Sequence, residues 1–334
     1  METGDKIQLE QSMIHRTIRN AVVTGPTGAI GTALCKKLLS EGIHVWAVCR
    51  PGSARAADLP EDEHLDIVYC DAKDILTLPD QNCAVNGRNA ARLDGADAFF
   101  HLAWAHTIGE GRNDMIAQTE NIQYTLYAVQ CAAKLGCQVF IGAGSQAEYG
   151  RVNGPLRADT PCNPENGYGM AKLCAGQMSR VEAGKLQVAH VWPRVLSVYG
   201  PHEHPSTMTS FLTKALLKGE KPALTAGEQI WDYLYSADAA DAFYRMAVSG
   251  RDGAVYPLGS GEARPLKEYI GKIRDTIDPA LPLGLGEIPY GKLQVMHLEA
   301  DITALKEDTG FEAHTDFATG IKETIDWIRS RENE

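Results

Sequence analysis

The sequence lacks the features that would direct it to a membrane or to a nucleic acid. No stretch approaches the roughly 18 consecutive apolar residues of a membrane span. Residues 1–20 contain no apolar core of signal-peptide length. The formal net charge is −11, whereas a nucleic-acid partner favours a basic surface. We therefore expect a cytoplasmic protein with neither a membrane nor a nucleic acid as its partner.

The sequence also lacks a metal or disulfide framework. It has eight cysteines, but their spacing is irregular and no C-x-x-C pair occurs, so we expect reduced thiols. His202 and His204 flank Glu203 on a proline-rich loop, a pattern more typical of a lid or a solvated turn than of metal ligands. We expect no metal site.

What the sequence does contain is a regular alternation of short apolar strands and helical stretches. It begins with a strand, a glycine turn, a helix and a second strand, and this unit implies a parallel sheet. Strands are predicted at 20–24, 44–49, 66–70, 98–102, 138–141 and from 188, and long helices at 115–135 and 168–181. We predict an α/β fold: a doubly wound parallel Rossmann sheet at 18–200 that carries the catalytic residues, and a smaller mixed α/β substrate region at 201–330, with some chain exchange between the two.

The first turn reads TGPTGAIG and predicts a dinucleotide site. Gly25 permits a tight turn, Gly28 leaves room for a pyrophosphate, and Gly31 allows the helix to pack closely on the strand. The free N–H groups at the start of the helix then face the phosphates. The predicted cofactor contacts in this turn are Gly25, Thr27, Gly28, Ala29, Ile30 and Gly31.

The second strand ends in CRPGSAR, without the acidic residue that usually holds the ribose of NAD. Arg50 could instead pair with a 2′-phosphate, helped by Ser53 or Arg55. This favours NADP and leaves NAD as the alternative.

A tyrosine, a lysine and a serine form the candidate catalytic set. Tyr168 and Lys172 are four residues apart, so they share one face of a helix. A nearby ammonium lowers the pKa of a phenol toward the working range. Ser145 follows the fifth strand, at the edge where α/β sheets bind ligands.

Together these motifs resemble the extended short-chain dehydrogenase/reductases, and more narrowly the NAD-dependent epimerase/dehydratase group that acts on nucleotide sugars. The matching pieces, in order, are TGPTGAIG, Asp71, HLA at 101–103, Asn121, GSQAEYG, YGMAK, PRVLSVYGP at 193–201 and WDYLYSADAADA at 231–242.

The resemblance assigns roles to individual residues. It implies that Ser145, Tyr168 and Lys172 are the catalytic triad and that Asn121 supports the site. It further implies cofactor contacts from Asp71 and Ala72 at the adenine and from Leu102, Ala103, Tyr168 and Lys172 at the nicotinamide end. On the substrate side the candidates are Trp104, Gln146, Arg194, Tyr199 and Trp231. Relatives often dimerise through the two long helices, so a homodimer is expected.

Two departures from the family pattern bear on the reaction. Dehydratases carry Asp-Glu or Ser-Glu directly after the serine or threonine, where this chain has Gln146 and Ala147, and Glu148 comes one residue too late. Many relatives have an arginine for the diphosphate where this chain has Trp231. Dehydration is therefore disfavoured, and the diphosphate needs other partners.

The leading hypothesis is reduction of a 4-keto group on a nucleotide-linked sugar, as in reductases similar to CDP-abequose synthase. The alternatives are a C4 epimerase that keeps NAD bound, a reductase of a non-sugar ketone, and a cofactor-binding sensor or scaffold without catalysis.

Overall fold

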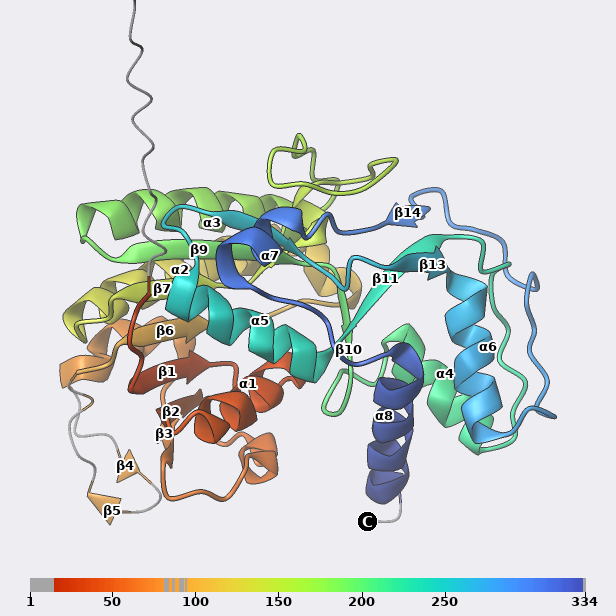
Figure 1. Ribbon diagram of the computed structural model, residues 1–334, viewed down its shortest axis with the longest axis horizontal. Coiled ribbons are helices and arrows are strands. Elements are labelled where there is room, and N and C mark those ends of the chain that lie inside the picture. Colours follow the sequence, from red (N-terminus) through yellow and green to blue (C-terminus); the bar gives the residue numbers. More distant parts are fainter. Residues whose placement is uncertain (1–14, 81–83, 86–87, 90–92, 94, 333–334) are drawn as a thin grey trace, which may run out of the picture.

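The computed structural model describes residues 15–80, 84–85, 88–89, 93 and 95–332 (Figure 1). Within these residues, ten strands form one sheet in the order β12-β9-β7-β6-β1-β2-β3-β4-β5, with β8 paired to β9. The strands are β1 Asn20–Thr24, β2 His44–Cys49, β3 Leu65–Tyr69, β4 Ala84–Val85, β5 Arg88–Asn89, β6 Ala98–His101, β7 Val139–Gly142, β8 Gly144–Ser145, β9 Ala189–Val195 and β12 Val255–Leu258. All pairings are parallel except those made by β4.

The predicted doubly wound sheet is confirmed. The chain runs outward from β1 through β2 and β3, and then returns to add β6, β7 and β9 on the other side of β1. Thr24 pairs with both Val48 and His101, so the carboxyl ends of β2, β1 and β6 lie at one edge. That reversal of strand order is where open α/β sheets bind their ligands.

Helices cover both faces of this sheet. On one face lie α1 (Ala29–Ser40) and α5 (Ser236–Ser249), and on the other α2 (Met115–Lys134) and α3 (Gly167–Lys185) (Figure 1). Residues of β1 alternate between the two cores: Ala21 and Val23 join the cluster that holds α1 and α5, and Val22 joins the cluster that holds α2. Because both faces are buried, the strand is a continuous apolar run without a polar alternation.

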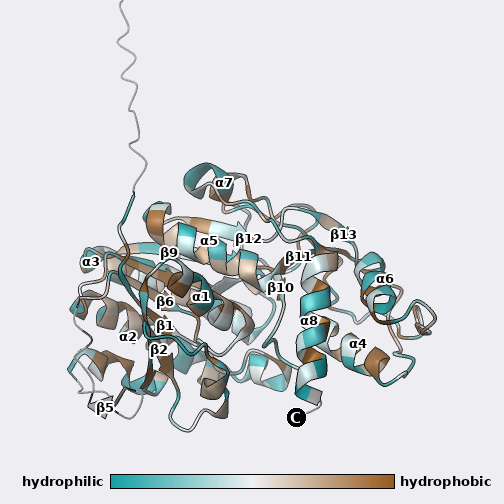
Figure 2. Ribbon diagram, turned by 60° about the horizontal axis from the view of Figure 1, so that its bottom comes forward, coloured by the Kyte–Doolittle hydropathy of each residue, from teal (hydrophilic) through white to brown (hydrophobic). Residues whose placement is uncertain are grey.

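A smaller mixed sheet lies beside the large one. It comprises β10 (Ser197–Tyr199), β11 (Ile230–Tyr235), β13 (Ala263–Pro265) and β14 (His297–Leu298), and it packs with α4 (Met208–Leu217), α6 (Leu266–Ile277) and α8 (Phe317–Glu332). The hydropathy colours of Figure 2 show α8 as a mixed helix, in keeping with its buried Ile321, Ile325 and Ile328.

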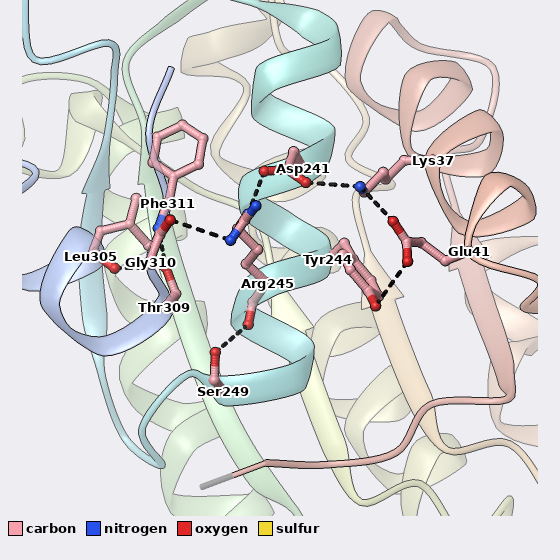
Figure 3. Close-up of polar contacts among 10 residues, drawn as sticks. All are labelled: Lys37, Glu41, Asp241, Tyr244, Arg245, Ser249, Leu305, Thr309, Gly310 and Phe311. Atoms are coloured by element: carbon pink, nitrogen blue, oxygen red, sulfur yellow. Dashed lines mark hydrogen bonds and ion pairs between the residues drawn. The ribbon is translucent and has the colours of Figure 1, made fainter. Parts of the chain in front are cut away.

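The chain crosses between the two regions near residue 200. β10 precedes that position and belongs to the small sheet, whereas β12, α5 and α7 (Thr303–Thr309) follow it and pack with the large one. Four charged residues, which we call the helix joint, tie α5 to α1: Lys37, Glu41, Asp241 and Arg245. Figure 3 shows Asp241 between Lys37 and Arg245, and Arg245 also donates to the carbonyl of Gly310 after α7.

Two further observations concern the cysteines and the helices, and both are made on the described residues only. The seven described cysteines are free, and Cys83 lies outside the described residues. Among the helices that the structure describes, none combines the length and the apolar character that crossing a membrane requires.

Candidate active site

The glycine turn joins β1 to α1 with backbone contacts that no larger residue could make. Gly25 has φ +69°, and a Cβ there would lie 2.8 Å from the backbone nitrogen of Ala103. A Cβ on Gly31 would lie 2.2 Å from the carbonyl oxygen of Gly25. Gly31 therefore packs closely against the turn that directly follows β1. These contacts hold the start of α1 beside the end of β6.

Gly28 differs from these two glycines because its Cβ position is open. The nearest heavy atom to a Cβ there is the Gly25 carbonyl oxygen at 3.8 Å. Gly28 is also the N-cap of α1 and offers no side chain to its N–H groups, and the first turn of α1 contains no acidic residue. An uncapped helix N-terminus with open space above it fits the pyrophosphate of a dinucleotide.

The residues predicted to surround the adenosine lie at the ends of β2 and β3. Arg50 is exposed, and no described residue accepts a hydrogen bond from its side chain. Arg55, by contrast, donates to the carbonyl of His202 at 2.7 Å, so it already ties this loop to the small region. Asp71 is partly exposed directly after β3, and Ala72 begins a 3-10 helix (Ala72–Asp80).

The candidate triad converges on the carboxyl ends of β7 and β8. Asn166 caps α3 by accepting from the Gly169 N–H at 2.9 Å, and Tyr168 and Lys172 then project from one face of the helix. The ammonium of Lys172 donates to the carbonyl of Ala143 at 2.6 Å. Ser145 is 8% exposed, and its hydroxyl lies close enough to Tyr168 to oppose the rise in the pKa of the phenol. Two segments that are distant in sequence, residues 143–145 and α3, are therefore needed to assemble the set.

Burial dominates the ionisation of this cluster. It lowers the pKa of Lys172 to about 7, against the pull of the nearby Glu148 carboxylate. Burial also raises the pKa of Tyr168, while the hydrogen bond from Ser145 and the charge of Arg112 oppose that rise. His101 lies beneath, and burial together with the Lys172 ammonium lowers its pKa to about 3. The histidine is therefore neutral at pH 7, whereas the lysine titrates near pH 7.

The segment after β6 covers the tyrosine and the lysine. The Trp104 ring lies 3.7 Å from Lys172 Nζ and edge-on to the Tyr168 ring, with centroids 6.1 Å apart. The Arg112 guanidinium lies 4.3 Å from the Tyr168 ring centroid. Gln118 of α2 holds the indole by accepting from Trp104 Nε1 at 2.9 Å. Arg112 and Gln118 were not predicted from the sequence, because no motif links them to the triad.

Asn121 has a clear place in this arrangement. Its amide accepts from the Ala105 N–H at 2.9 Å and donates to the Ala105 carbonyl at 3.0 Å. It therefore anchors the backbone just beyond Trp104.

The predicted substrate residues do not all lie together. Gln146 is partly exposed directly after Ser145. Arg194 is 7% exposed and forms an ion pair with Glu148, with Nε 2.7 Å from Oε2. Tyr199 is 1% exposed in an aromatic cluster with Tyr233, Tyr235 and Phe317, so we leave it out of the substrate contacts proposed below. Trp231 bridges the strands of the small sheet through a 2.8 Å bond to Ser197.

A metal was not expected near His202. The His202 imidazole packs against the Trp327 ring in a tilted arrangement, with centroids 4.8 Å apart, and Glu203 accepts from the hydroxyls of Thr209 and Ser210. Within the described part of the chain, no three His, Cys, Asp or Glu side chains gather in a way that could hold a metal ion.

The fold and site define a nicotinamide-dependent enzyme of the extended short-chain dehydrogenase/reductase type. Residues 21–259 match the model of the NAD dependent epimerase/dehydratase family, and the chain belongs to that family. The resemblance inferred from the motifs is thereby confirmed.

Three known proteins are similar to this chain over most of its length. A UDP-glucose 4-epimerase from Mycolicibacterium smegmatis is 25% identical over 93% of this chain and 98% of its own length. A dTDP-6-deoxy-L-talose 4-dehydrogenase (NAD⁺) from Aggregatibacter actinomycetemcomitans is 27% identical over 78% of this chain and 93% of its own. A UDP-N-acetylglucosamine 4-epimerase from Methanobrevibacter ruminantium, solved with UDP-N-acetylmuramic acid, superposes with a TM-score of 0.83 at 22% identity, over 95% of this chain and all of that one.

Proposed function

We propose that this enzyme uses NAD(P) to reduce a 4-keto group on a nucleotide-linked sugar. The observation that carries the proposal is the common edge of the sheet. Thr24 pairs with His101, and His101 pairs with Gly142, so the glycine turn, Ala103 and the Ser145 segment follow three adjacent strand ends. A dinucleotide lying on the turn would therefore extend toward Tyr168.

The chain's own residues supply the proton chemistry. Bound NAD(P)H supplies the hydride. Because burial raises the pKa of Tyr168, its phenol is protonated at neutral pH and can donate to the oxygen formed from the keto group. Ser145 hydrogen-bonds the same oxygen, and the Lys172 ammonium stabilises the phenolate that remains. Trp104 and Gln146 line the substrate side.

The epimerase alternative is a second candidate, and it draws on the names of two relatives, which are both 4-epimerases. Epimerisation uses the same proton donor in both directions and leaves the cofactor unchanged overall. Reduction consumes one NAD(P)H for each sugar. Mass balance between cofactor and product, measured with both 4-keto and 4-hydroxy sugars linked to UDP, dTDP and CDP, separates the two reactions, because only the 4-hydroxy sugars are substrates of an epimerase.

Elimination of water is not part of the proposal. Gln146 and Ala147 stand where a dehydratase has its acids, and both oxygens of Glu148 already accept hydrogen bonds from the protein. No acid next to Ser145 is therefore free to protonate a departing hydroxyl.

The catalytic assignment is tested with Tyr168→Phe, which keeps the ring but removes the proton donor. General acid catalysis contributes about 10²–10⁴-fold, so turnover should fall by that order in stopped-flow measurements of NADPH oxidation. The cofactor affinity of Tyr168→Phe should change little. Lys172→Met, by contrast, should lower both turnover and cofactor affinity. Tyr244→Phe on α5 is the matched control. Parent-like turnover by Tyr168→Phe would remove this tyrosine from the mechanism.

We further propose that NADP is preferred over NAD, because Arg50 is free to meet a 2′-phosphate. A charge-assisted hydrogen bond contributes about 1.5–3 kcal/mol, so Arg50→Ala should reduce the NADPH preference by roughly 10- to 150-fold. Calorimetric titration of both cofactors measures it, with Arg264→Ala on the small sheet as the control. Equal affinities of the parent for NADPH and NADH would refute the preference.

We also propose a homodimer through α2 and α3. Apolar side chains are exposed on these helices: Ile116 of α2 is 75% exposed, and Met170, Met178 and Val181 are exposed along α3. A contiguous exposed apolar face is typical of an interface. Light scattering should give twice the chain mass for the parent, and the monomer mass for Met178→Lys/Val181→Glu.

A further inference from the structure

An arginine that was not predicted from the sequence lies over the candidate proton donor. Arg112 belongs to the 3-10 helix Gly109–Asn113, and its guanidinium carbon is 4.3 Å from the centre of the Tyr168 ring. Both side chains are partly exposed, so a ligand that reaches the tyrosine can also reach the arginine. Arg112 Nη1 donates to the Thr107 carbonyl at 3.0 Å, and a carbonyl does not neutralise the positive charge. The proposed function assigns this charge no role.

The backbone on both sides of Arg112 is held in place. Gln118 of α2 donates to the Gly111 carbonyl at 3.0 Å, and Asn113 Oδ1 accepts from the Gly167 N–H at 3.0 Å, at the start of α3. A Cβ on Gly167 would lie 3.0 Å from the Arg112 carbonyl oxygen, so this glycine allows the close approach. The arginine is therefore fixed to the two helices that surround the site.

Positive charge beside Tyr168 is left without a partner in the protein. The Lys172 ammonium lies 5.8 Å from the centre of the same ring. Among the residues that the structure describes, neither Arg112 nor Lys172 forms an ion pair, and Glu148 is already paired with Arg194. Two cations beside one phenol favour a ligand that brings a negative charge of its own.

We infer that Arg112 binds a carboxylate of the substrate, which is then a nucleotide-linked 4-keto sugar acid with its carboxylate at C6. The inference rests on the proposed function, because that function places C4 at Tyr168. In a six-membered sugar ring C6 is attached to C5, next to C4, whereas the diphosphate is attached to C1 on the opposite side of the ring. A guanidinium beside Tyr168 therefore meets the C6 group, and its planar fork matches the two carboxylate oxygens.

Binding of the carboxylate is separate from the redox step. Tyr168 donates its proton to the C4 oxygen as C4 accepts hydride from the bound cofactor, and the C6 carboxylate leaves the reaction unchanged. Arg112 thus selects the substrate and neither gives nor takes a proton.

The test compares two nucleotide sugars that differ only at C6, UDP-glucuronate and UDP-glucose. The enzyme is first saturated with the reduced cofactor, which cannot oxidise a 4-hydroxyl, so calorimetry measures binding without turnover. A charge-assisted hydrogen bond contributes about 10- to 150-fold in affinity, so the parent should bind the acid at least about tenfold more tightly. Added salt should weaken this preference, because the arginine is partly exposed. The comparison is repeated with the dTDP-linked pair.

Three variants locate the preference. Arg112→Met removes the charge and should abolish the preference by weakening the binding of the acid alone. Arg112→Lys keeps a charge without the fork and should retain part of it. Arg251→Met is the matched control, since Arg251 precedes β12 at the amino end of that strand and pairs with Asp308. The control should keep the preference of the parent.

The inference is overturned if the parent binds the acid no more tightly than the neutral sugar with either nucleotide, or if the preference survives in Arg112→Met. Equal weakening of UDP-glucuronate, UDP-glucose and UDP by Arg112→Met would assign the arginine to the diphosphate and would also overturn it. Failure of the proposed function appears elsewhere, as parent-like turnover by Tyr168→Phe.

Discussion

Two ionic clusters in this protein have similar distances and very different surroundings. The site pair, Glu148 and Arg194, is separated by 2.7 Å with side chains only 1% and 8% exposed. In the helix joint, Lys37 lies 2.7 Å from Glu41 and 3.0 Å from Asp241, and its members are 16–36% exposed (Figure 3). The distances alone would make the two clusters equivalent.

Burial is what separates them. Charges in the helix joint keep part of their hydration, so losing a partner returns each ion to water at small cost. Charges in the site pair have no water to return to, and each depends on the other together with the N–H donors of Ser145 and Trp192. The first cluster tolerates change, and the second should respond sharply. Three predictions test this difference, from the largest effect to the smallest.

Arg194→Met should give the largest loss of stability. It leaves Glu148 without its countercharge in a fully buried position, and breaking a buried pair by removing one partner costs about 3–5 kcal/mol. Urea unfolding followed by circular dichroism measures the free energy of unfolding. A loss below about 1 kcal/mol would place the site pair in the same class as the helix joint.

Lys172→Met should increase stability, because Lys172 is a buried cation without an ion-pair partner among the described residues. Its pKa is about 7 in the fold, against 10.5 for an ordinary lysine, so the unfolded chain binds more protons between these values. The parent therefore gains stability as pH rises from about 7 to about 10.5.

The variant should lack this slope. Its advantage should be at most about 5 kcal/mol at pH 7 and below, and should shrink toward pH 10.5. Unfolding measured at pH 6, 8 and 10 gives the profile. An advantage that does not change with pH would indicate a packing effect only.

Asp241→Asn should have the smallest effect. Removing a partly exposed ion pair costs about 0–1 kcal/mol, and added salt should weaken the difference further. Thermal unfolding at low and at high salt measures it, with Lys37→Met as the companion from the other helix. A cost comparable to that of Arg194→Met would mean that burial does not control these clusters.

The comparison also shows why some predictions from the sequence were accurate and others were not. The strands at 20–24 and 44–49 agree with β1 and β2 residue for residue, because a buried strand bounded by glycine turns is a local pattern.

The predictions for the site likewise divide into local features, which were predicted, and long-range contacts, which were not. The grouping of Tyr168 with Lys172 on one face follows from helical spacing, and their approach to Ser145 follows from the position of strand ends in parallel sheets. Trp104 was expected near the substrate, but its contact with Lys172 was not. Arg194 was expected at the substrate and lies in the site pair, because its β9 position brings it to Glu148.

By itself, the sequence determined the doubly wound fold, the glycine turn and the residue types available for catalysis, since each depends on spacings of a few residues. Only the tertiary structure decided which charges share a buried volume. Trp192 and Arg194 reach Glu148 across 44 and 46 residues of chain, and Lys172 reaches Ala143 across 29. The ionisation of Lys172 depends on such long-range neighbours and on the exclusion of water, neither of which has a local signature in the sequence.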